Sequence, residues 1–286
     1  FASLRYFETL SKSNPNVANV YNNIGMIYSE LEELGKSLDY LNKAAGLYLQ
    51  KQDTIGLGAV LTNIAIHYKK KGNIGKALVM IDSAIQTKKR SRDYYGLAIG
   101  YNQKAEILKT SNQMDEAYEA LLNSLNYSKR INDQSAQAAT YQLLHDVFLF
   151  RGEYDKALRY NNMAYKIALK INDKKLLVKN FENLSEIFRT RGDYQKAYEN
   201  YVRYTELKDS LIQQKQLSNI YELEFQHQLD KQQHEIVRLQ EQQELQDLKI
   251  ESQQLKLSKR NLQLILIITV SIILLLLFYL LYMKDR

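Results

Sequence analysis

RGEYDKALRYNNMAYKIALKIND, residues 151–173, is the stretch that decides the fold, because its pattern recurs along the chain at a fixed interval. A small residue returns every 40 residues, at Ser37, Ala77, Ala117, Ala157 and Ala197. An aspartate follows the same step, at Asp53, Asp93, Asp133 and Asp173. A fixed period of this size is typical of a stacked array of repeats rather than of one globular core.

Each repeat is predicted to contain two helices. In residues 138–173 the first helix carries Tyr141, Leu144 and Phe148, which lie on one helical face. Gly152 suits the turn that follows, since glycine adopts positive φ without steric cost. Ala157 lies on the second helix, at a point where two helices approach closely. The aspartate that ends the repeat is expected to cap the next helix by accepting a free backbone N–H.

The spacing resembles the tetratricopeptide repeat. Its residues are Tyr21, Ile24, Gly25, Tyr28, Ser37, Leu41 and Ala44 in the first copy, and Leu61, Ile64, Ala65, Tyr68, Ala77, Ile81 and Ala84 in the second. Further copies carry Tyr101, Ala105, Leu108, Ala117 and Leu121, then Tyr141, Leu144, Phe148, Ala157 and Ala164, then Phe181, Leu184, Phe188, Ala197 and Tyr201. The resemblance implies an all-α fold, a superhelical α-solenoid whose first helices line a concave face. The step of 40 exceeds the 34 residues that are commonest in the family.

Composition agrees with a helical array and excludes several classes of site. The chain of 286 residues has one proline and 11 glycines, and both residue types disfavour helix interiors. It has no cysteine, which excludes disulfides and cysteine-based zinc sites. The net charge of +7 is spread among mixed charges, which favours a solvated surface over a nucleic-acid interface. No catalytic motif is present, so we expect no enzyme activity, no cofactor and no metal site in this chain.

The domain organisation follows from the repeat register. Residues 1–17 match the second helix of an incomplete repeat, and 18–212 hold five repeats. Gln213 replaces the next aspartate, and no glycine or proline follows Gly192. The last second helix is therefore predicted to continue without a break from about Tyr194 into residues 213–261. That stretch favours a coiled coil that forms a parallel homodimer, while a single solvated helix remains the alternative.

Residues 262–282 form an uncharged, apolar run. Its length suits a bilayer core of about 30 Å, and the sequence predicts a transmembrane helix there. Residues 283–286 would then begin a juxtamembrane segment. The domain order resembles membrane-anchored bacterial tetratricopeptide sensors, in which a histidine kinase or a helix-turn-helix domain follows. That resemblance implies a single-pass protein of the bacterial inner membrane with periplasmic repeats, although the cationic residues before the run favour the opposite orientation.

A row of polar residues recurs on the first helices and predicts a binding groove. The row comprises Asn22, Thr62, Asn102, Gln142 and Glu182, and its neighbours include Asn23, Asn63, Gln103 and Asn183. Glu186 and Arg189 add mixed charge at one end. Amide side chains both donate and accept, so they can pair with the backbone of a bound peptide. The alternative is that these side chains are solvated or bond to local backbone.

Two functions are consistent with these features. The first is the sensory region of a membrane-anchored receptor, in which the groove binds a peptide or protein and the coil transmits the change. The second is a membrane-tethered scaffold that assembles protein complexes without signalling. Both expect a protein partner in the groove and no direct contact with nucleic acid.

Overall fold

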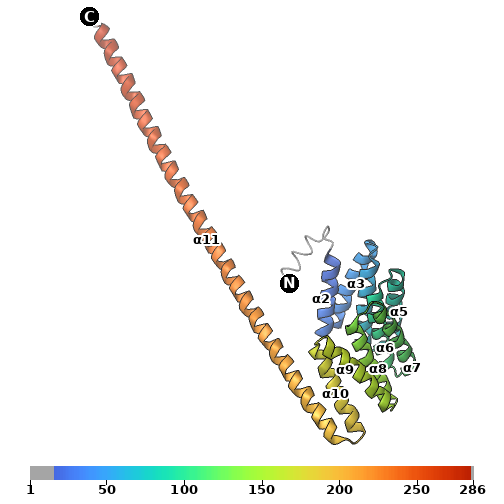
Figure 1. Ribbon diagram of the computed structural model, residues 1–286. Coiled ribbons are helices and arrows are strands. Elements are labelled where there is room, and N and C mark those ends of the chain that lie inside the picture. The colour runs from blue at the N-terminus through green and yellow to red at the C-terminus, as the bar shows by residue number, and fades with distance from the viewer. Residues whose placement is uncertain (1–15, 285–286) are drawn as a thin grey trace. The chain divides into compact units, whose positions relative to one another are not determined.

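The computed structural model describes residues 16–284, with side chains from 16 to 273, and its regular structure over that range is α-helical (Figure 1). The helices are α2 (Val17–Glu30), α3 (Leu34–Gln50), α4 (Thr54–Lys70), α5 (Ile74–Arg90), α6 (Tyr94–Thr110), α7 (Met114–Arg130), α8 (Gln134–Phe150), α9 (Tyr154–Lys170), α10 (Lys174–Thr190) and α11 (Tyr194–Lys284). The chain divides into two compact units, residues 1–212 and 213–286.

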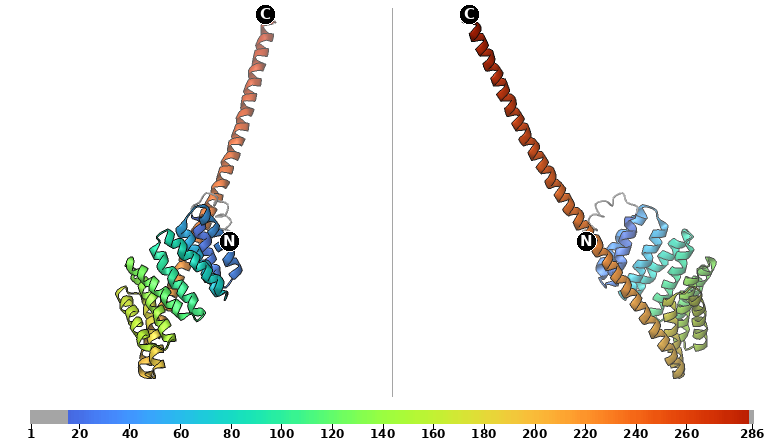
Figure 2. Two further views of the ribbon diagram at one scale, coloured as in Figure 1. Left: turned by 90° about the vertical axis from the view of Figure 1, so that its right-hand side faces the viewer. Right: turned by 60° about the vertical axis from the view of Figure 1, so that its left-hand side comes forward.

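The first unit is a stack of helix pairs (Figures 1 and 2). Helix α2 packs on α3, α4 on α5, α6 on α7, and α8 on α9. The even-numbered helices, which are the first helices of their repeats, also contact one another from α2 through α10. These contacts make them one layer of the solenoid. The prediction of an all-α repeat solenoid is confirmed, whereas most of the predicted partial repeat, residues 1–15, lies outside the described range.

Aspartates begin the first helices, as the 40-residue ladder predicts. Asp53 accepts a hydrogen bond from the backbone N–H of Gly56, and Asp93 accepts one from Gly96. Asp133 and Asp173 cap α8 and α10 in the same way. Each side chain replaces an acceptor that the first turn of a helix lacks, which typically stabilises the helix by about 1 kcal/mol.

Tight turns join the two helices of each repeat. Gly152, between α8 and α9, has a φ of 72°, in the left-handed region that glycine adopts readily. Glu32 and Asn112 stand at the corresponding turns of other repeats with φ of 60° and 59°. The turn geometry is therefore shared even where the residue is not glycine, and Gly152 meets it at the lowest conformational cost.

The small residues of the 40-residue step lie inside the stack. Ala77, Ala117 and Ala157 are completely buried, and so is Ser37. Ala157 belongs to a core cluster that also contains Leu121 from α7, Leu144 from α8 and Ile187 from α10. Residues from successive repeats share this cluster, so the apolar face of each helix pair is covered by its neighbours.

Helix α11 runs without interruption from Tyr194 to Lys284. This confirms the predicted continuity across residues 207–217. The physical reason is the one that the sequence provides: Gln213 offers no aspartate cap, and no glycine or proline interrupts the backbone hydrogen bonds.

The predicted transmembrane helix over 262–282 is wrong. Across the described part of the chain, none of the helices combines the length and the apolar character that a bilayer crossing requires. For the same reason, the predicted single-pass location in a bacterial inner membrane, with periplasmic repeats, is wrong. The juxtamembrane segment predicted at 283–286 depended on that transmembrane helix. Residues 285–286 lie outside the described range.

Candidate functional site

A cavity of about 410 Å³ lies on the layer formed by the first helices. Its lining comes from α6, α8, α10 and the cap of α8: Tyr95, Ile99, Asn102, Gln103, Glu106, Asp133, Ser135, Ala136, Ala139, Gln142, Leu143, Asp146 and Lys179. We call this cavity the inner groove. Three consecutive repeats contribute to it, so it exists only because the repeats are stacked.

The inner groove combines an apolar floor with charged edges. Ile99 on α6, with Ala139 and Leu143 on α8, supplies aliphatic surface. Tyr95 is 59% exposed, so most of its ring is available to a ligand. The carboxylates and the single ammonium group of the lining can orient a ligand whose apolar side chain enters the floor.

Ion pairs hold the groove carboxylates in place. Lys69 Nζ on α4 lies 2.6 Å from Glu106 Oε2 on α6. Lys109 Nζ on α6 lies 2.5 Å from Asp146 Oδ2 on α8. The two pairs are one repeat apart and join consecutive first helices. They are charge-assisted hydrogen bonds between half-buried groups, which fix geometry more than they stabilise the fold.

Lys179 remains charged in the groove. Burial alone would lower the pKa of its ammonium group, but Glu182, 2.8 Å away, and the carboxylates of Asp146 and Glu186 outweigh that effect and raise the pKa. The groove therefore presents a fixed positive charge at its α10 side and fixed negative charges on α6 and α8.

Three of the predicted site residues line the inner groove: Asn102, Gln103 and Gln142. The Asn102 side-chain oxygen accepts a hydrogen bond from Thr140 at 3.1 Å. The Gln142 amide donates to the carbonyl oxygen of Leu176 on α10 at 3.2 Å. Gln103 is half-buried. Asn102 and Gln142 thus each combine a structural hydrogen bond with a position in the groove lining.

The predicted residues of the first two repeats lie elsewhere. Asn63 on α4 donates its amide to the side-chain oxygen of Asn22 on α2 at 2.8 Å, so the two form a pair between repeats. Asn23 is exposed on α2. Thr62 is buried and accepts a hydrogen bond from Lys88 Nζ at 2.8 Å. None of these four lines the inner groove.

The predicted residues of the fifth repeat separate into two places. Asn183 is 1% exposed and donates to Asn161 Oδ1 at 3.2 Å, between α10 and α9. Glu182, Glu186 and Arg189 line a second cavity of about 520 Å³, together with Ser185, Tyr201, Tyr204, Thr205, Lys208 and Asp209. That cavity is formed by α10 and the first part of α11, within the first unit.

The sequence prediction missed the residues that make the groove apolar. Tyr95 and Ile99 lie on α6, two turns and one turn before Gln103, and Ala139 lies one turn before Leu143. The signal that could have found them was present, since residues three and four apart share a helical face. Extending the face of Gln103 toward the start of the helix leads to Ile99 and then to Tyr95.

Buried histidines contribute packing. The His145 ring is completely buried, with Nδ1 3.2 Å from the carbonyl oxygen of Ala157. Burial lowers the pKa of His145, and it also lowers the pKa of His67. Both rings are consequently held in the neutral form at neutral pH, as suits side chains that pack between helices.

Comparison with known proteins places this geometry in a recognised fold. Residues 18–51 match the tetratricopeptide repeat family. No curated protein sequence matches the chain. BtubC (BKLC) from P. vanneervenii is similar in structure, with a TM-score of 0.63 at 19% identity over 73% of this chain and 88% of that one.

Two further solved structures share the fold. A signal transduction ATPase with numerous domains and a tetratricopeptide repeat sensor, from Pyrococcus horikoshii, aligns with a TM-score of 0.60 at 19% identity. The alignment covers 71% of this chain and 31% of that one. A putative kinesin light chain repeat protein from Podosopora anserina aligns with a TM-score of 0.54 at 13% identity over 70% of this chain and 98% of that one. The first unit is a tetratricopeptide-like solenoid, an architecture that typically mediates protein–protein interaction.

Proposed function

We propose that the repeat array binds an extended segment of a partner protein in the inner groove. The observation that carries this proposal is the groove itself, in which an aliphatic floor and fixed charges from three repeats face the same cavity. A segment with an aliphatic or aromatic side chain would fill the floor beside Ile99 and Tyr95. A neighbouring lysine or arginine would face Glu106 and Asp146.

The groove amides would contact the backbone of that segment. Gln103 and Gln142 each have a donor and an acceptor on the side chain, which matches the alternating N–H and C=O groups of an extended peptide. Lys179 supplies a further donor for a peptide carbonyl or carboxylate. This arrangement sets the direction of the segment across α6, α8 and α10.

A Gln142→Ala variant is expected to weaken binding of a groove-selected peptide by about tenfold, because the peptide backbone loses a hydrogen bond in a partly desolvated site. Peptides would be selected by display against the full chain, and the dissociation constant would be measured by fluorescence anisotropy. Asn126→Ala is the matched control, since Asn126 is an exposed amide on α7. Equal affinities for wild type and Gln142→Ala would contradict the role of the groove.

We also propose that the second unit forms a homodimer through the predicted coiled coil. Leu248 and Leu255 lie one heptad apart on α11 and are 61% and 57% exposed in the single chain. Pairing two such helices would cover these side chains, and burial of each leucine is worth about 1.5–3 kcal/mol.

A Leu248→Lys, Leu255→Lys double variant is expected to be monomeric at micromolar concentration where the wild type is dimeric, because two like charges per helix would face each other. Sedimentation equilibrium measures the outcome. Gln240→Lys with Gln254→Lys, two exposed positions off this heptad seam, is the control that adds the same charge. A wild type that sediments as a monomer would remove the proposal.

The array serves either as a sensory region or as an assembly scaffold. The P. horikoshii protein combines the same fold with a sensor role, which supports the sensory proposal. In that role, peptide binding in the inner groove changes the dimer dissociation constant of the chain. In a scaffold it leaves that constant unchanged. Sedimentation with and without the selected peptide separates the two.

A further inference from the structure

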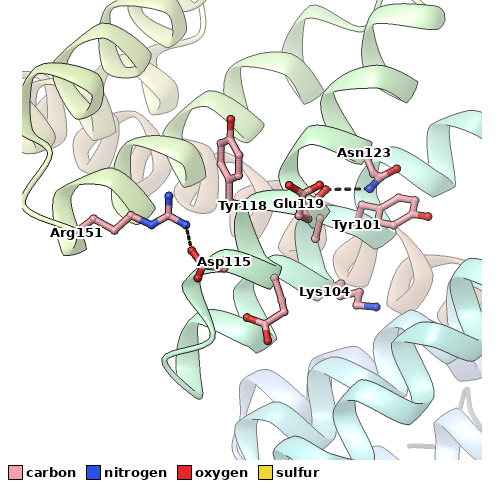
Figure 3. A pocket seen from close by; sticks show the side chains of 9 residues that line it. Tyr101, Lys104, Asp115, Tyr118, Glu119, Asn123 and Arg151 are labelled. Carbon is pink, nitrogen blue, oxygen red and sulfur yellow. Dashed lines mark hydrogen bonds and ion pairs between the residues drawn. The ribbon is translucent and has the colours of Figure 1, made fainter.

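The third repeat contains a cavity of about 560 Å³ that lies apart from the inner groove (Figure 3). Tyr101 and Lys104 from α6 line it, as do Asp115, Glu116, Tyr118, Glu119, Ala120 and Asn123 from α7 and Arg151 from the turn after α8. We call it the third-repeat cavity. Tyr101 and Lys104 do lie on α6, but the residues that line the inner groove on that helix are different ones.

Two of the lining residues, Lys104 and Ala120, differ in polarity or size from their counterparts in the other repeats. Lys104 stands where the other repeats have Ile24, Ile64, Leu144 and Leu184. Ala120 stands where they have Tyr40, Met80, Tyr160 and Asn200. A polar group thus replaces an aliphatic one, and a methyl group replaces side chains that are much larger. Both substitutions fall on the cavity wall.

In two other repeats a tyrosine ring occupies the position that corresponds to Ala120. Tyr40 stacks on Tyr28 with ring centroids 5.6 Å apart, and it lies 5.8 Å from Tyr21. Tyr160 stacks on Phe148 at 5.3 Å and lies 6.1 Å from Tyr141. In both repeats the second helix provides an aromatic ring that packs against the first.

Tyr101 is the third-repeat equivalent of Tyr21 and Tyr141. Ala120 brings no ring to it, and Leu108 stands where Tyr28 and Phe148 stand. Tyr127 from α7 already stacks on Tyr101, with ring centroids 5.8 Å apart. An incoming ring beside Ala120 would extend this stack. Offset aromatic pairs at such centroid distances attract each other beyond the effect of the area that they bury.

The charges around the cavity favour a cationic ligand. Lys104 Nζ lies 2.7 Å from Asp82, and Arg151 lies 2.5 Å from Asp115, so both cations of the lining are paired. Glu116 and Glu119 are exposed carboxylates that neither pair uses. The lining holds three carboxylates and two cations, a net charge of −1. A positive group beside the ring would meet Glu116 or Glu119.

We propose that the third-repeat cavity binds an aromatic ring that carries a neighbouring positive charge, in the place that Tyr40 and Tyr160 fill in their own repeats. The ring belongs either to an aromatic residue next to a lysine or arginine in a partner protein, or to a small aromatic amine. The two sources share the chemistry of recognition, and their affinities separate them.

The test uses the full chain and two probes, tyramine and the blocked peptide acetyl-Lys-Tyr-Lys-amide, observed by saturation-transfer difference NMR. Tyramine is expected to bind with a dissociation constant of about 1 mM, as suits a ligand of this size, and isoamylamine at least fivefold more weakly. A peptide that binds ten times more tightly than tyramine assigns the site to a partner protein. Tyramine binding as tightly as the peptide assigns it to a small amine.

Ala120→Tyr places the missing ring in the cavity and is expected to weaken both probes at least tenfold. Met80→Tyr, which adds a ring at the same position of the second repeat, is expected to change nothing. Glu119→Lys is a second variant, on an exposed side chain, and is expected to weaken tyramine about fivefold, while Glu199→Lys in the fifth repeat does not. No binding by either probe, equal binding of isoamylamine, or affinities unaffected by both Ala120→Tyr and Glu119→Lys would overturn the proposal.

Discussion

Replacing Lys88 with methionine is expected to raise the free energy of unfolding by about 1–3 kcal/mol near neutral pH. Lys88 lies on α5 and is 3% exposed, and its Nζ donates to Thr62 Oγ1. A hydroxyl group compensates only part of the cost of removing an ammonium group from water. Methionine keeps a stem of similar length, which packs beside Gly58 and Gly100, and brings no charge.

The lowered pKa of Lys88 determines how the free energy of unfolding depends on pH. Burial lowers the pKa of Lys88 to about 8, against the opposing attraction of Asp93. Between pH 8 and about 10.5 the unfolded chain holds a proton that the folded chain has lost, so stability rises with pH across that window. Below pH 8 both states are charged, and the folded state carries the full cost of burial.

Urea denaturation of wild type and Lys88→Met at pH 7 and pH 10 would measure both effects. The gain from the substitution is expected to shrink at pH 10, where the buried amine is neutral. Lys129→Met is the control, because Lys129 is exposed near the end of α7. A lower stability of Lys88→Met than of wild type at pH 7 would show that the Thr62 hydrogen bond outweighs the desolvation cost.

A Leu144→Ala variant is expected to lose about 3 kcal/mol of stability. Leu144 is completely buried in the cluster that α6, α7, α8, α9 and α10 share, so the cavity left by truncation would lie between repeats. Each repeat depends on its neighbours for stability, and a lesion at this point weakens the coupling on both sides of α8.

Thermal and urea unfolding followed by circular dichroism would measure the loss. Leu169→Ala is the matched substitution, because Leu169 is 53% exposed on α9 and its truncation should change stability by well under 1 kcal/mol. Similar losses for the two variants would mean that the interface between repeats contributes less than its burial implies.

The 40-residue step predicted the repeat fold because equivalent positions in successive repeats must make the same packing contacts. Asp133 and Gly152 were predictable in the same way, since helix caps and left-handed turns restrict residue type locally. The unbroken α11 followed from the absence of such signals after Gly192. These features depend on residues near one another in sequence.

The site was harder to predict because recurrence does not reveal which polar column faces a cavity. Gln142 lines the inner groove, yet Thr62 of the same column is buried under Lys88. Asn183 and Asn161 bond to each other inside the stack, a partnership between helices that no single repeat pattern displays. The transmembrane helix at 262–282 was predicted from composition alone. The described part of α11 does not meet the requirements for a membrane span.

The ion pairs Lys69–Glu106 and Lys109–Asp146 connect successive repeats through the layer of first helices. Each ion pair joins one first helix to the next, from α4 to α6 and from α6 to α8. In the next repeat the position of Lys69 and Lys109 is occupied by Leu149, which cannot form an ion pair with Glu186. Helices α8 and α10 are joined instead by the neutral hydrogen bond from Gln142 to Leu176. A neutral hydrogen bond holds two helices together less strongly than an ion pair. We therefore expect the solenoid to bend more easily between α8 and α10 than between α4 and α6 or between α6 and α8.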